Sequence, residues 1–309
     1  MSGLRRPDDS WDIASSVGAT AVMVAAGRAA ETRRPDGLIS DPYAELLVAH
    51  AGTGIWEHMV DDVLVARLEE LDDVLAGMLE HMRTYQAVRT HYFDRFFADA
   101  VSAGIEQMVI LASGLDTRAY RLGWPTATTV YEIDQPKVLE YKAAVLAEND
   151  VPQAARLRPI GFDLREDWPN ALREAGFDAT RATAWLAEGL LMYLPADAQD
   201  RLFENITTLS APGSRIAVEV MNLHNPARRD DMQQRFARIA DQLGIPQSTD
   251  MRDLIYDDPD RSDVVEWLDT HLWRARAVSA RDVRLQLGRN SALPVEEDSA
   301  FATFVTAAR

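Results

Sequence analysis

One stretch of the chain, residues 107–121, constrains the fold more than any other. It opens with a short apolar run, Met108 to Ala112, which is typical of a strand buried on both faces of a parallel sheet. The run ends in a small-residue turn at Ser113 and Gly114. Such a turn presents free backbone N–H groups where open α/β sheets bind nucleotides, and glycine lets a ligand come close. Taken alone, the stretch fits a nucleotide-binding turn and an ordinary buried strand equally well.

A second strand-like run, residues 128–134, shifts the balance toward nucleotide binding. It ends in Asp134, which lies 20 residues beyond Gly114 (134 − 114). An acid at the end of the second strand, at about this spacing from the glycine turn, is the group that holds the hydroxyls of a ribose. Glu132 lies on the same run, and we expect only one of the two acids to face the ligand, the other supporting the turn or the edge of the core.

The chain beyond residue 100 alternates between strand and helix patterns. The predicted strands are 108–112, 128–133, 156–161, 183–187, 214–220, 273–279 and 301–307. The predicted helices between them are 115–122, 135–149, 168–175, 196–210 and 280–288. This alternation predicts an α/β fold with a mostly parallel sheet and helices on both faces.

The first hundred residues have a helical pattern instead. The predicted helices are 11–30, 42–49, 56–80 and 83–100. Asp41 and Pro42 have the order of an N-cap and a first helical residue. We expect residues 1–309 to form a single domain, in which residues 1–100 are a helical N-terminal cap and residues 101–309 are the α/β core.

The interval from about residue 222 to 267 is too long for a simple crossover. It follows the fifth predicted strand, so it lies on the side of the sheet where ligands bind. We expect it to cover the site rather than to be a surface ornament, because loops at this face usually carry function.

Three motifs follow one another in the chain: Ala-Ser-Gly-Leu-Asp-Thr-Arg-Ala-Tyr-Arg-Leu (112–122), Tyr-Glu-Ile-Asp-Gln-Pro (131–136) and Ala-Glu-Gly-Leu-Leu-Met-Tyr-Leu (187–194). Together they resemble the leucine carboxyl methyltransferase-like family, and within it the mycobacterial branch of S-adenosylmethionine-dependent methyltransferases. The resemblance extends from about Ala19 to the C-terminus. It implies the class I methyltransferase fold, which is Rossmann-like and has seven strands, the last antiparallel beside the sixth. It also implies S-adenosyl-L-methionine as the cofactor and S-adenosyl-L-homocysteine as the product.

The resemblance assigns cofactor contacts to individual residues. Arg89 would pair with the methionine carboxylate, and Glu188 would contact the amino group. Asp134 is the acid of the second strand, and Asp163 with Leu164 would receive the adenine. The predicted cofactor-binding residues are Arg89, Ser113, Gly114, Asp134, Asp163, Leu164 and Glu188.

Two of these assignments have structural alternatives. Without the resemblance, Arg89 would be read as a solvated arginine on a helix, because charged helix faces are usually solvent-exposed. Asp163 would be read as the N-cap of the helix that follows it.

The catalytic group is not identified by the sequence. Tyr193 and Glu219 are the candidates, and Asn222 is placed to face the substrate. Methyl transfer to a carboxylate needs no general base, so alignment of donor and acceptor would suffice. Transfer to a hydroxyl needs a base, with Glu219 or a histidine as candidates. We expect O-methylation of a small carboxylate or hydroxyl acceptor, and the sequence leaves the choice open.

Charge and composition limit the partners, metals and cellular location that we expect for the protein. The net charge is −17 and the pI is near 4.7, which argues against nucleic acid as a partner. There is no cysteine, and the six histidines show no metal spacing, so no metal is predicted. No apolar run is long enough to span a membrane, and we expect a cytoplasmic protein. The cover segments look unlike those of the eukaryotic enzymes, which makes a protein C-terminus a doubtful acceptor. The oligomeric state is not predicted.

Two other functions remain open. A nicotinamide-dependent oxidoreductase ranks low, because the turn lacks Gly-x-Gly-x-x-Gly and Asp116 would repel a pyrophosphate. A cofactor-binding but catalytically silent regulatory protein is compatible with every motif named above.

Overall fold

The structure of the protein is a computed structural model. It describes residues 17–49, 51, 70, 72–221, 234, 238, 241, 255, 256, 258–290 and 301–309. The beginning of the first predicted helix, most of the helix predicted over 56–80 and nearly all of 222–254 lie outside the described residues.

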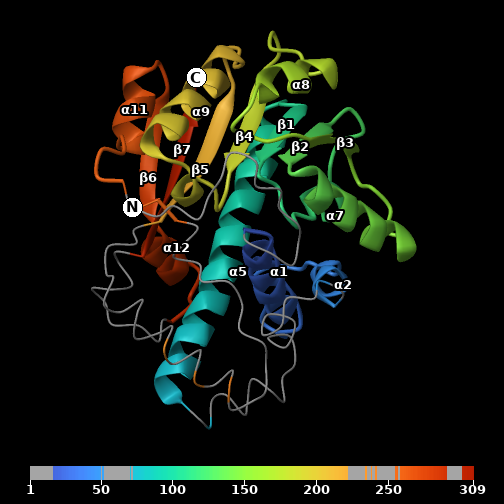
Figure 1. Ribbon diagram of the computed structural model, residues 1–309, viewed down its shortest axis with the longest axis vertical. Helices are drawn as coiled ribbons and strands as arrows, with labels where there is room; N and C mark the ends of the chain where they lie inside the picture. Colours follow the sequence, from blue (N-terminus) through green and yellow to red (C-terminus); the bar gives the residue numbers. More distant parts are fainter. Residues whose placement is uncertain are drawn as a thin grey trace.

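The described residues form one seven-stranded sheet in the order β3-β2-β1-β4-β5-β7-β6 (Figure 1). The strands are β1 (Gln107–Leu111), β2 (Thr129–Asp134), β3 (Arg156–Gly161), β4 (Thr183–Ala187), β5 (Arg215–Met221), β6 (Arg274–Ser279) and β7 (Ala302–Ala308). The first five run parallel, and β7 lies between β5 and β6, antiparallel to both. All seven predicted strands form, each within one residue of its predicted bounds. The expected class I methyltransferase architecture is confirmed, with β7 pairing to β5 as well as to β6.

Helices cover both faces of the sheet (Figure 1). They are α1 (Val17–Thr32), α2 (Ala44–Val48), α5 (Asp73–Ser102), α6 (Arg118–Arg121), α7 (Pro136–Glu148), α8 (Trp168–Glu174), η1 (Leu191–Tyr193), α9 (Ala196–Thr208), α11 (Val264–Thr270) and α12 (Ala280–Gln286). One buried apolar cluster joins α1, α5, α7 and α12 to one face, and a second joins α8, α9 and α11 to the other. Within the described residues, no helix is both long and apolar enough to cross a membrane.

Strand β1 lies at the centre of the sheet and is buried along its whole length. Met108 and Ile110 belong to the cluster on the α5 face, whereas Val109 and Leu111 belong to the cluster on the α9 face. Successive side chains of a strand point to opposite faces, so a central strand covered on both sides must be apolar throughout. This is why the run at 108–112 identified the strand.

Helix α5 differs from its prediction. The helix predicted over 83–100 begins earlier, so that α5 runs from Asp73 to Ser102 and includes the end of the segment predicted over 56–80, most of which lies outside the described residues. Phe93 and Phe97 on this helix are fully buried and belong to the core. The helix packs on α1 and also contacts β4 and β5. It therefore reaches from the N-terminal helices to the sheet (Figure 1).

The capping hydrogen bond predicted for Asp41 forms, although Asp41 lies two residues before the assigned N-cap position of α2. Helix α2 begins at Ala44, with Tyr43 at the N-cap position. Asp41 is buried, and its carboxylate accepts hydrogen bonds from the N–H of Tyr43 at 3.2 Å, from Arg28 and from the hydroxyl of Thr117. An ionised carboxylate that is taken out of water needs such partners, so Asp41 holds the start of α2 and also binds Arg28.

A buried ion pair between Lys142 and Glu132 supports the turn after β1. The ammonium of Lys142, on α7, lies 2.7 Å from Glu132 Oε2 and donates to the backbone oxygen of Asp116 at 3.1 Å. Both side chains of the pair are almost completely shielded from solvent. Glu132 is thus the acid of β2 that supports the turn, and Lys142 ties α7, β2 and the turn together.

Breaking this pair is expected to destabilise the fold strongly. Lys142→Met leaves Glu132 charged, buried and unpaired, which costs about 3–5 kcal/mol in the free energy of unfolding. The double variant Lys142→Met/Glu132→Leu should recover most of that loss, because neither charge then remains. Urea denaturation monitored by circular dichroism measures both. Asp197→Asn, which breaks the exposed pair with Arg201, is the control and should change stability by less than about 1 kcal/mol. A single variant as stable as this control would contradict the role given to Lys142.

Candidate cofactor site

A pocket of about 230 Å³ opens at the carboxyl ends of the parallel strands. All the residues predicted to bind the cofactor line it: Arg89, Ser113, Gly114, Asp134, Asp163, Leu164 and Glu188. They follow the order of the sheet, with Asp163 after β3, Asp134 at the end of β2, Gly114 after β1 and Glu188 after β4. Arg89 reaches the pocket from α5. Five segments far apart in the sequence are therefore brought together at one edge.

The turn after β1 has an unusual backbone. Ala112 has φ of 51° and Gly114 has φ of 49°. A Cβ added to Gly114 would lie 3.1 Å from the Cβ of Ala21 on α1. The hydroxyl of Ser113 is buried and has no hydrogen-bond partner in the described part of the chain. The turn therefore brings backbone and one unsatisfied hydroxyl to the pocket wall.

Asp134 is held by the two backbone N–H groups that flank it in space. Its Oδ2 accepts from the N–H of Gly114 at 2.5 Å, and its Oδ1 accepts from the N–H of Gln135 at 2.6 Å. Burial raises the pKa of Asp134 above its ordinary value, and the two N–H donors counteract part of that rise. Each carboxylate oxygen keeps a lone pair for a further donor. The arrangement fixes an acceptor that can receive hydroxyl donors from a ligand in the pocket.

Asp163 is not the N-cap of the helix that follows it. That position belongs to Asp167, whose side chain accepts from the N–H of Asn170. Asp163 instead accepts from Gln135 Nε2 at 2.8 Å and from Arg165. Burial raises its pKa, but the hydrogen bonds from Arg165 and Gln135 outweigh burial and hold the pKa below the ordinary value. Asp163 therefore stays ionised at the adenine end of the predicted site.

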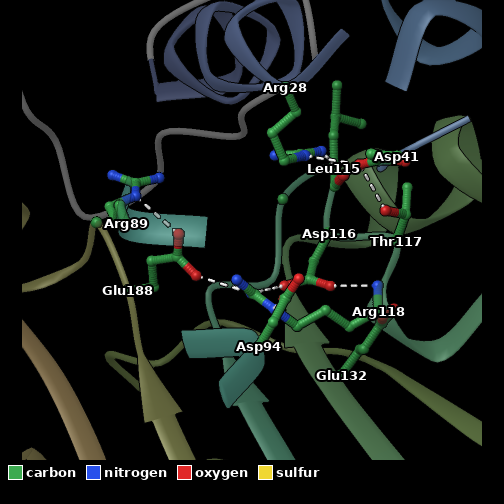
Figure 2. Close-up of polar contacts among 12 residues, drawn as sticks. Arg28, Asp41, Arg89, Asp94, Leu115, Asp116, Thr117, Arg118, Glu132 and Glu188 are labelled. Carbon is green, nitrogen blue, oxygen red and sulfur yellow. Dashed lines mark hydrogen bonds and ion pairs between the residues drawn. The ribbon is translucent and has the colours of Figure 1, made fainter. Parts of the chain in front are cut away.

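A chain of buried ion pairs runs across the other end of the pocket (Figure 2). Arg89 Nε lies 2.7 Å from one oxygen of Glu188, and Arg118 Nη1 lies 2.7 Å from the other. Arg118 also pairs with Asp94 at 2.7 Å and with Asp116 at 2.5 Å. Arg89 is 5% exposed, so it is a buried member of this chain rather than a solvated helix arginine.

A second group of contacts fastens α1 to the same turn (Figure 2). Arg28 donates to Asp41 at 2.7 Å and to the backbone oxygen of Leu115 at 2.6 Å. Both terminal nitrogens of Arg121 donate to the carboxylate of Asp94 on α5. These contacts connect the N-terminal helices to the β1 turn through charged groups that are almost fully buried.

The charges in this cluster keep one another ionised. The pKa of Asp116 lies below its ordinary value, because Arg118 and Lys142 outweigh the effect of burial. The pKa of Arg118 is raised for the matching reason, since Asp116, Glu188 and Asp94 outweigh burial. At neutral pH the cluster is thus a set of fixed charges.

Of the two catalytic candidates, only Tyr193 lines the pocket. The Glu219 side chain is fully buried and accepts from three donors: the hydroxyl of Tyr85, Arg89 Nη1 at 3.0 Å and the N–H of Gly189 at 2.6 Å. Burial and the neighbouring Glu219 raise the pKa of Tyr85 well above its ordinary value. Glu219 therefore lies behind Arg89 and holds it in place.

A sequence model of the leucine carboxyl methyltransferase family matches residues 21–207, more than half of the 309-residue chain. The chain belongs to this family. It is an S-adenosylmethionine-dependent methyltransferase, and S-adenosylmethionine is its cofactor. The narrower resemblance to a mycobacterial branch stays a prediction.

Solved structures of other methyltransferases are similar in fold. A Thermobifida fusca protein provisionally described as a methyltransferase shares 18% identity over 96% of each chain, with a TM-score of 0.48. Magnesium protoporphyrin IX methyltransferase from Synechocystis, solved with bound S-adenosylhomocysteine, shares 10% identity over 74% of this chain and 86% of that one, with a TM-score of 0.42. An rRNA methylase from Streptococcus thermophilus shares 16% identity over 70% of this chain and 95% of that one, with a TM-score of 0.38. At such low similarity these proteins decide nothing about the acceptor.

The sequence motifs alone did not assign a role in the site to several residues of the pocket. Arg28, Asp116, Arg118 and Arg121 all line it. Asp116 and Arg118 stand inside the motif at 112–122, and an acid and an arginine two residues apart on a ligand-binding turn were the available signal. Arg28 carried no such signal, because its partners Asp41 and Leu115 are 13 and 87 residues away in the chain.

The backbone of the turn predicts that substitutions at Gly114 and at Ala112 affect the free energy of unfolding to different extents. Gly114→Ala should lower the free energy of unfolding by about 1–2 kcal/mol, because a side chain at positive φ is strained and the new Cβ meets Ala21. Ala112→Gly should change it by less than about 1 kcal/mol, because relief of strain at φ 51° offsets the added freedom of the unfolded chain. Urea denaturation of both variants tests this. Equal losses at the two positions would show that the turn does not have this backbone.

Proposed function

We propose that S-adenosylmethionine lies across the carboxyl edge of the sheet, with adenine near Asp163 and Leu164, ribose at Asp134 and methionine at Glu188 and Arg89. The observation that carries this proposal is the order of these residues along β3, β2, β1 and β4, in one pocket. Their chemistry suits the parts of the cofactor: a carboxylate for two hydroxyls, and an arginine with an acid for an amino acid. The buried hydroxyl of Ser113 has no other partner among the described residues, and Gly114 leaves room for a close approach.

Arg89 retains a free donor for the methionine carboxylate. Its contacts with described residues use Nε and Nη1, which face Glu188 and Glu219. Nη2 is left for a ligand in the pocket. The two glutamates thus orient the guanidinium, and Glu188 remains positioned for the amino group.

S-adenosylmethionine supplies an electrophilic methyl group on a positively charged sulfur. The residues of this chain bind and orient it, and they present the acceptor oxygen on the opposite side of the carbon. The O–CH₃ bond forms as the S–CH₃ bond breaks, and the departing sulfur keeps the bonding electron pair and becomes neutral. No proton has to reach the leaving group, so orientation in a sheltered site can supply about 7–11 kcal/mol of the barrier reduction.

A carboxylate acceptor is favoured over a hydroxyl. A hydroxyl must lose a proton to a base within hydrogen-bond reach. Among the described residues that line the pocket there is no histidine, and Glu188 is held by two arginines. Glu219 is occupied by three donors, and Tyr85 itself donates to it. A carboxylate is already an anion and needs none of these groups. We therefore propose methylation of a carboxylate oxygen on a small molecule.

The remaining expectations concern partners and organisation. We propose that residues 1–100 serve as a cap within a single domain, since α1 and α5 both line the pocket. The net charge of −17 favours a small-molecule acceptor over nucleic acid, and a cytoplasmic location fits the absence of cysteine.

The ribose contact can be tested by substitution and by pH. Asp134→Asn should weaken the binding of S-adenosylhomocysteine at least about tenfold, because an amide cannot accept from both Gly114 and Gln135 and also from the ribose. In the wild type, affinity should fall as the pH is lowered, since protonation removes the acceptor. Because its pKa is raised, that fall should begin at a higher pH than an ordinary aspartate value of 3.8 implies.

Isothermal titration calorimetry at several pH values provides the measurement. Asp99→Asn, which changes an exposed acid of α5, is the matched control and should bind like the wild type. Unchanged affinity in Asp134→Asn would remove the ribose from this position.

The lack of a general base among the described residues of the pocket predicts a simple pH profile. With a carboxylate acceptor, kcat should stay level from about pH 6 to 9, because the acceptor is ionised throughout this range. Tyr85→Phe should leave the shape of the profile unchanged, since Tyr85 only orients Glu219. Formation of S-adenosylhomocysteine under saturating acceptor is the quantity to follow. A rising limb near neutral pH that disappears in Tyr85→Phe would instead identify proton transfer through this pair.

A further inference from the structure

The end of the pocket away from Asp163 has an apolar wall. Met192 follows β4 in η1, and Met221 ends β5, the next strand of the sheet. Met82 on α5 and Met23 on α1 line the same pocket. All four side chains are partly exposed, and we call them the methionine wall. Methionine is flexible and polarisable, so a surface of this kind accommodates apolar groups of irregular shape.

A single uncharged amide lies between the methionine wall and the charged cluster. Gln86 follows Met82 by four residues and precedes Arg89 by three, so the three side chains share one face of α5. Gln86 lines the pocket, yet it is only 3% exposed. Its Oε1 is sealed from solvent and has no hydrogen-bond partner among the described residues. A buried amide left unpaired loses its hydrogen bonds to water without replacement, so this one is suited to a ligand that pairs with it.

Helix α1 fixes the direction of this side chain. A Cβ added to Gly27 would lie 3.0 Å from both Cβ and Cγ of Gln86. The stem of Gln86 is therefore pressed against the backbone of α1, and its amide has little freedom to turn away. Met23 lies one turn earlier on the same helix, which places the amide beside the methionine wall.

We propose that Gln86 and the methionine wall bind the acceptor, which is a carboxylic acid with an apolar body and a hydroxyl group near the carboxylate. The apolar body lies against the methionine wall, the hydroxyl pairs with the amide of Gln86, and the carboxylate lies toward Glu188 and Arg89, where the methyl group is delivered. This inference rests on the proposed placement of the cofactor.

Gln86 is assigned to the acceptor rather than to the cofactor because of its position. The proposed cofactor contacts occupy the ends of β3, β2, β1 and β4 and Arg89 of α5. Gln86 lies one turn before Arg89 on α5, toward Met82 and away from the sheet, to which α5 connects at its C-terminal end. A group there faces the space beyond the methionine part of the cofactor.

The test uses the full-length protein saturated with S-adenosylhomocysteine, titrated calorimetrically with four probes: decanoate, 2-hydroxydecanoate, 3-hydroxydecanoate and succinate. Decanoate should bind, and succinate should bind at least about tenfold more weakly, because it cannot fill the methionine wall. At least one hydroxydecanoate should bind about tenfold more tightly than decanoate. In Gln86→Leu that preference for the hydroxyl should disappear while decanoate still binds.

Two further variants guard against misfolding of Gln86→Leu. Met192→Gln should weaken decanoate binding about tenfold with little effect on the hydroxyl preference. Leu285→Gln changes an exposed residue of α12 and should match the wild type. Circular dichroism and the affinity for S-adenosylhomocysteine establish that each variant is folded.

The inference is overturned if succinate binds as well as decanoate, if decanoate does not bind, or if wild type and Gln86→Leu show the same hydroxyl preference or none. These failures are distinct from failure of the cofactor site. In that case S-adenosylhomocysteine would not bind to the wild type, or would bind equally well to Asp134→Asn.

Discussion

The site depends on one interaction, the buried chain of ion pairs in which Glu188 joins Arg89 to Arg118. Arg89 comes from α5, Glu188 follows β4, and Arg118 begins α6 after the β1 turn. These side chains are at most 12% exposed, so each charge needs the others. Removing one partner from such a group typically costs about 3–5 kcal/mol, because the remaining charge stays buried. The chain of ion pairs therefore fixes the relative positions of a helix, a turn and a strand end.

This constraint also shapes the chemistry. Among the described residues, the acids that line the pocket are paired with arginines or with backbone N–H groups, so none of them is left to accept a proton. What the cluster supplies is orientation and fixed charge, which suit a displacement that needs no acid or base. In our proposal, Gln86 and the methionine wall are the part of the pocket that distinguishes acceptors. The proposed acceptor site and the proposed adenine site then lie at opposite ends of one cavity.

The sequence predicted the sheet, and the residues that it proposed for the cofactor line one pocket, because both inferences rest on local signals. A central strand must be apolar throughout, and acids that follow parallel strands must meet at one edge. The sequence did not indicate which residues pair with the buried charges. Arg89 and Glu219 lie 130 residues apart, and nothing local marks Arg28 as the partner of Leu115. At Asp41 the local signal indicated the hydrogen bond from the N–H of Tyr43, but not the pairing with Arg28.

Arg118 pairs with three carboxylates at once, and we infer that it organises the cofactor site in this way. Arg118→Lys keeps the charge but replaces a planar fork with a point charge that cannot reach Asp94, Asp116 and Glu188 together. The most direct measurement is calorimetric titration of this variant with S-adenosylhomocysteine, next to the wild type. We predict that the variant remains folded and binds S-adenosylhomocysteine at least about tenfold more weakly than the wild type does. Binding within about twofold of the wild type would mean that a point charge suffices, and the ion-pair chain would not be what positions the site.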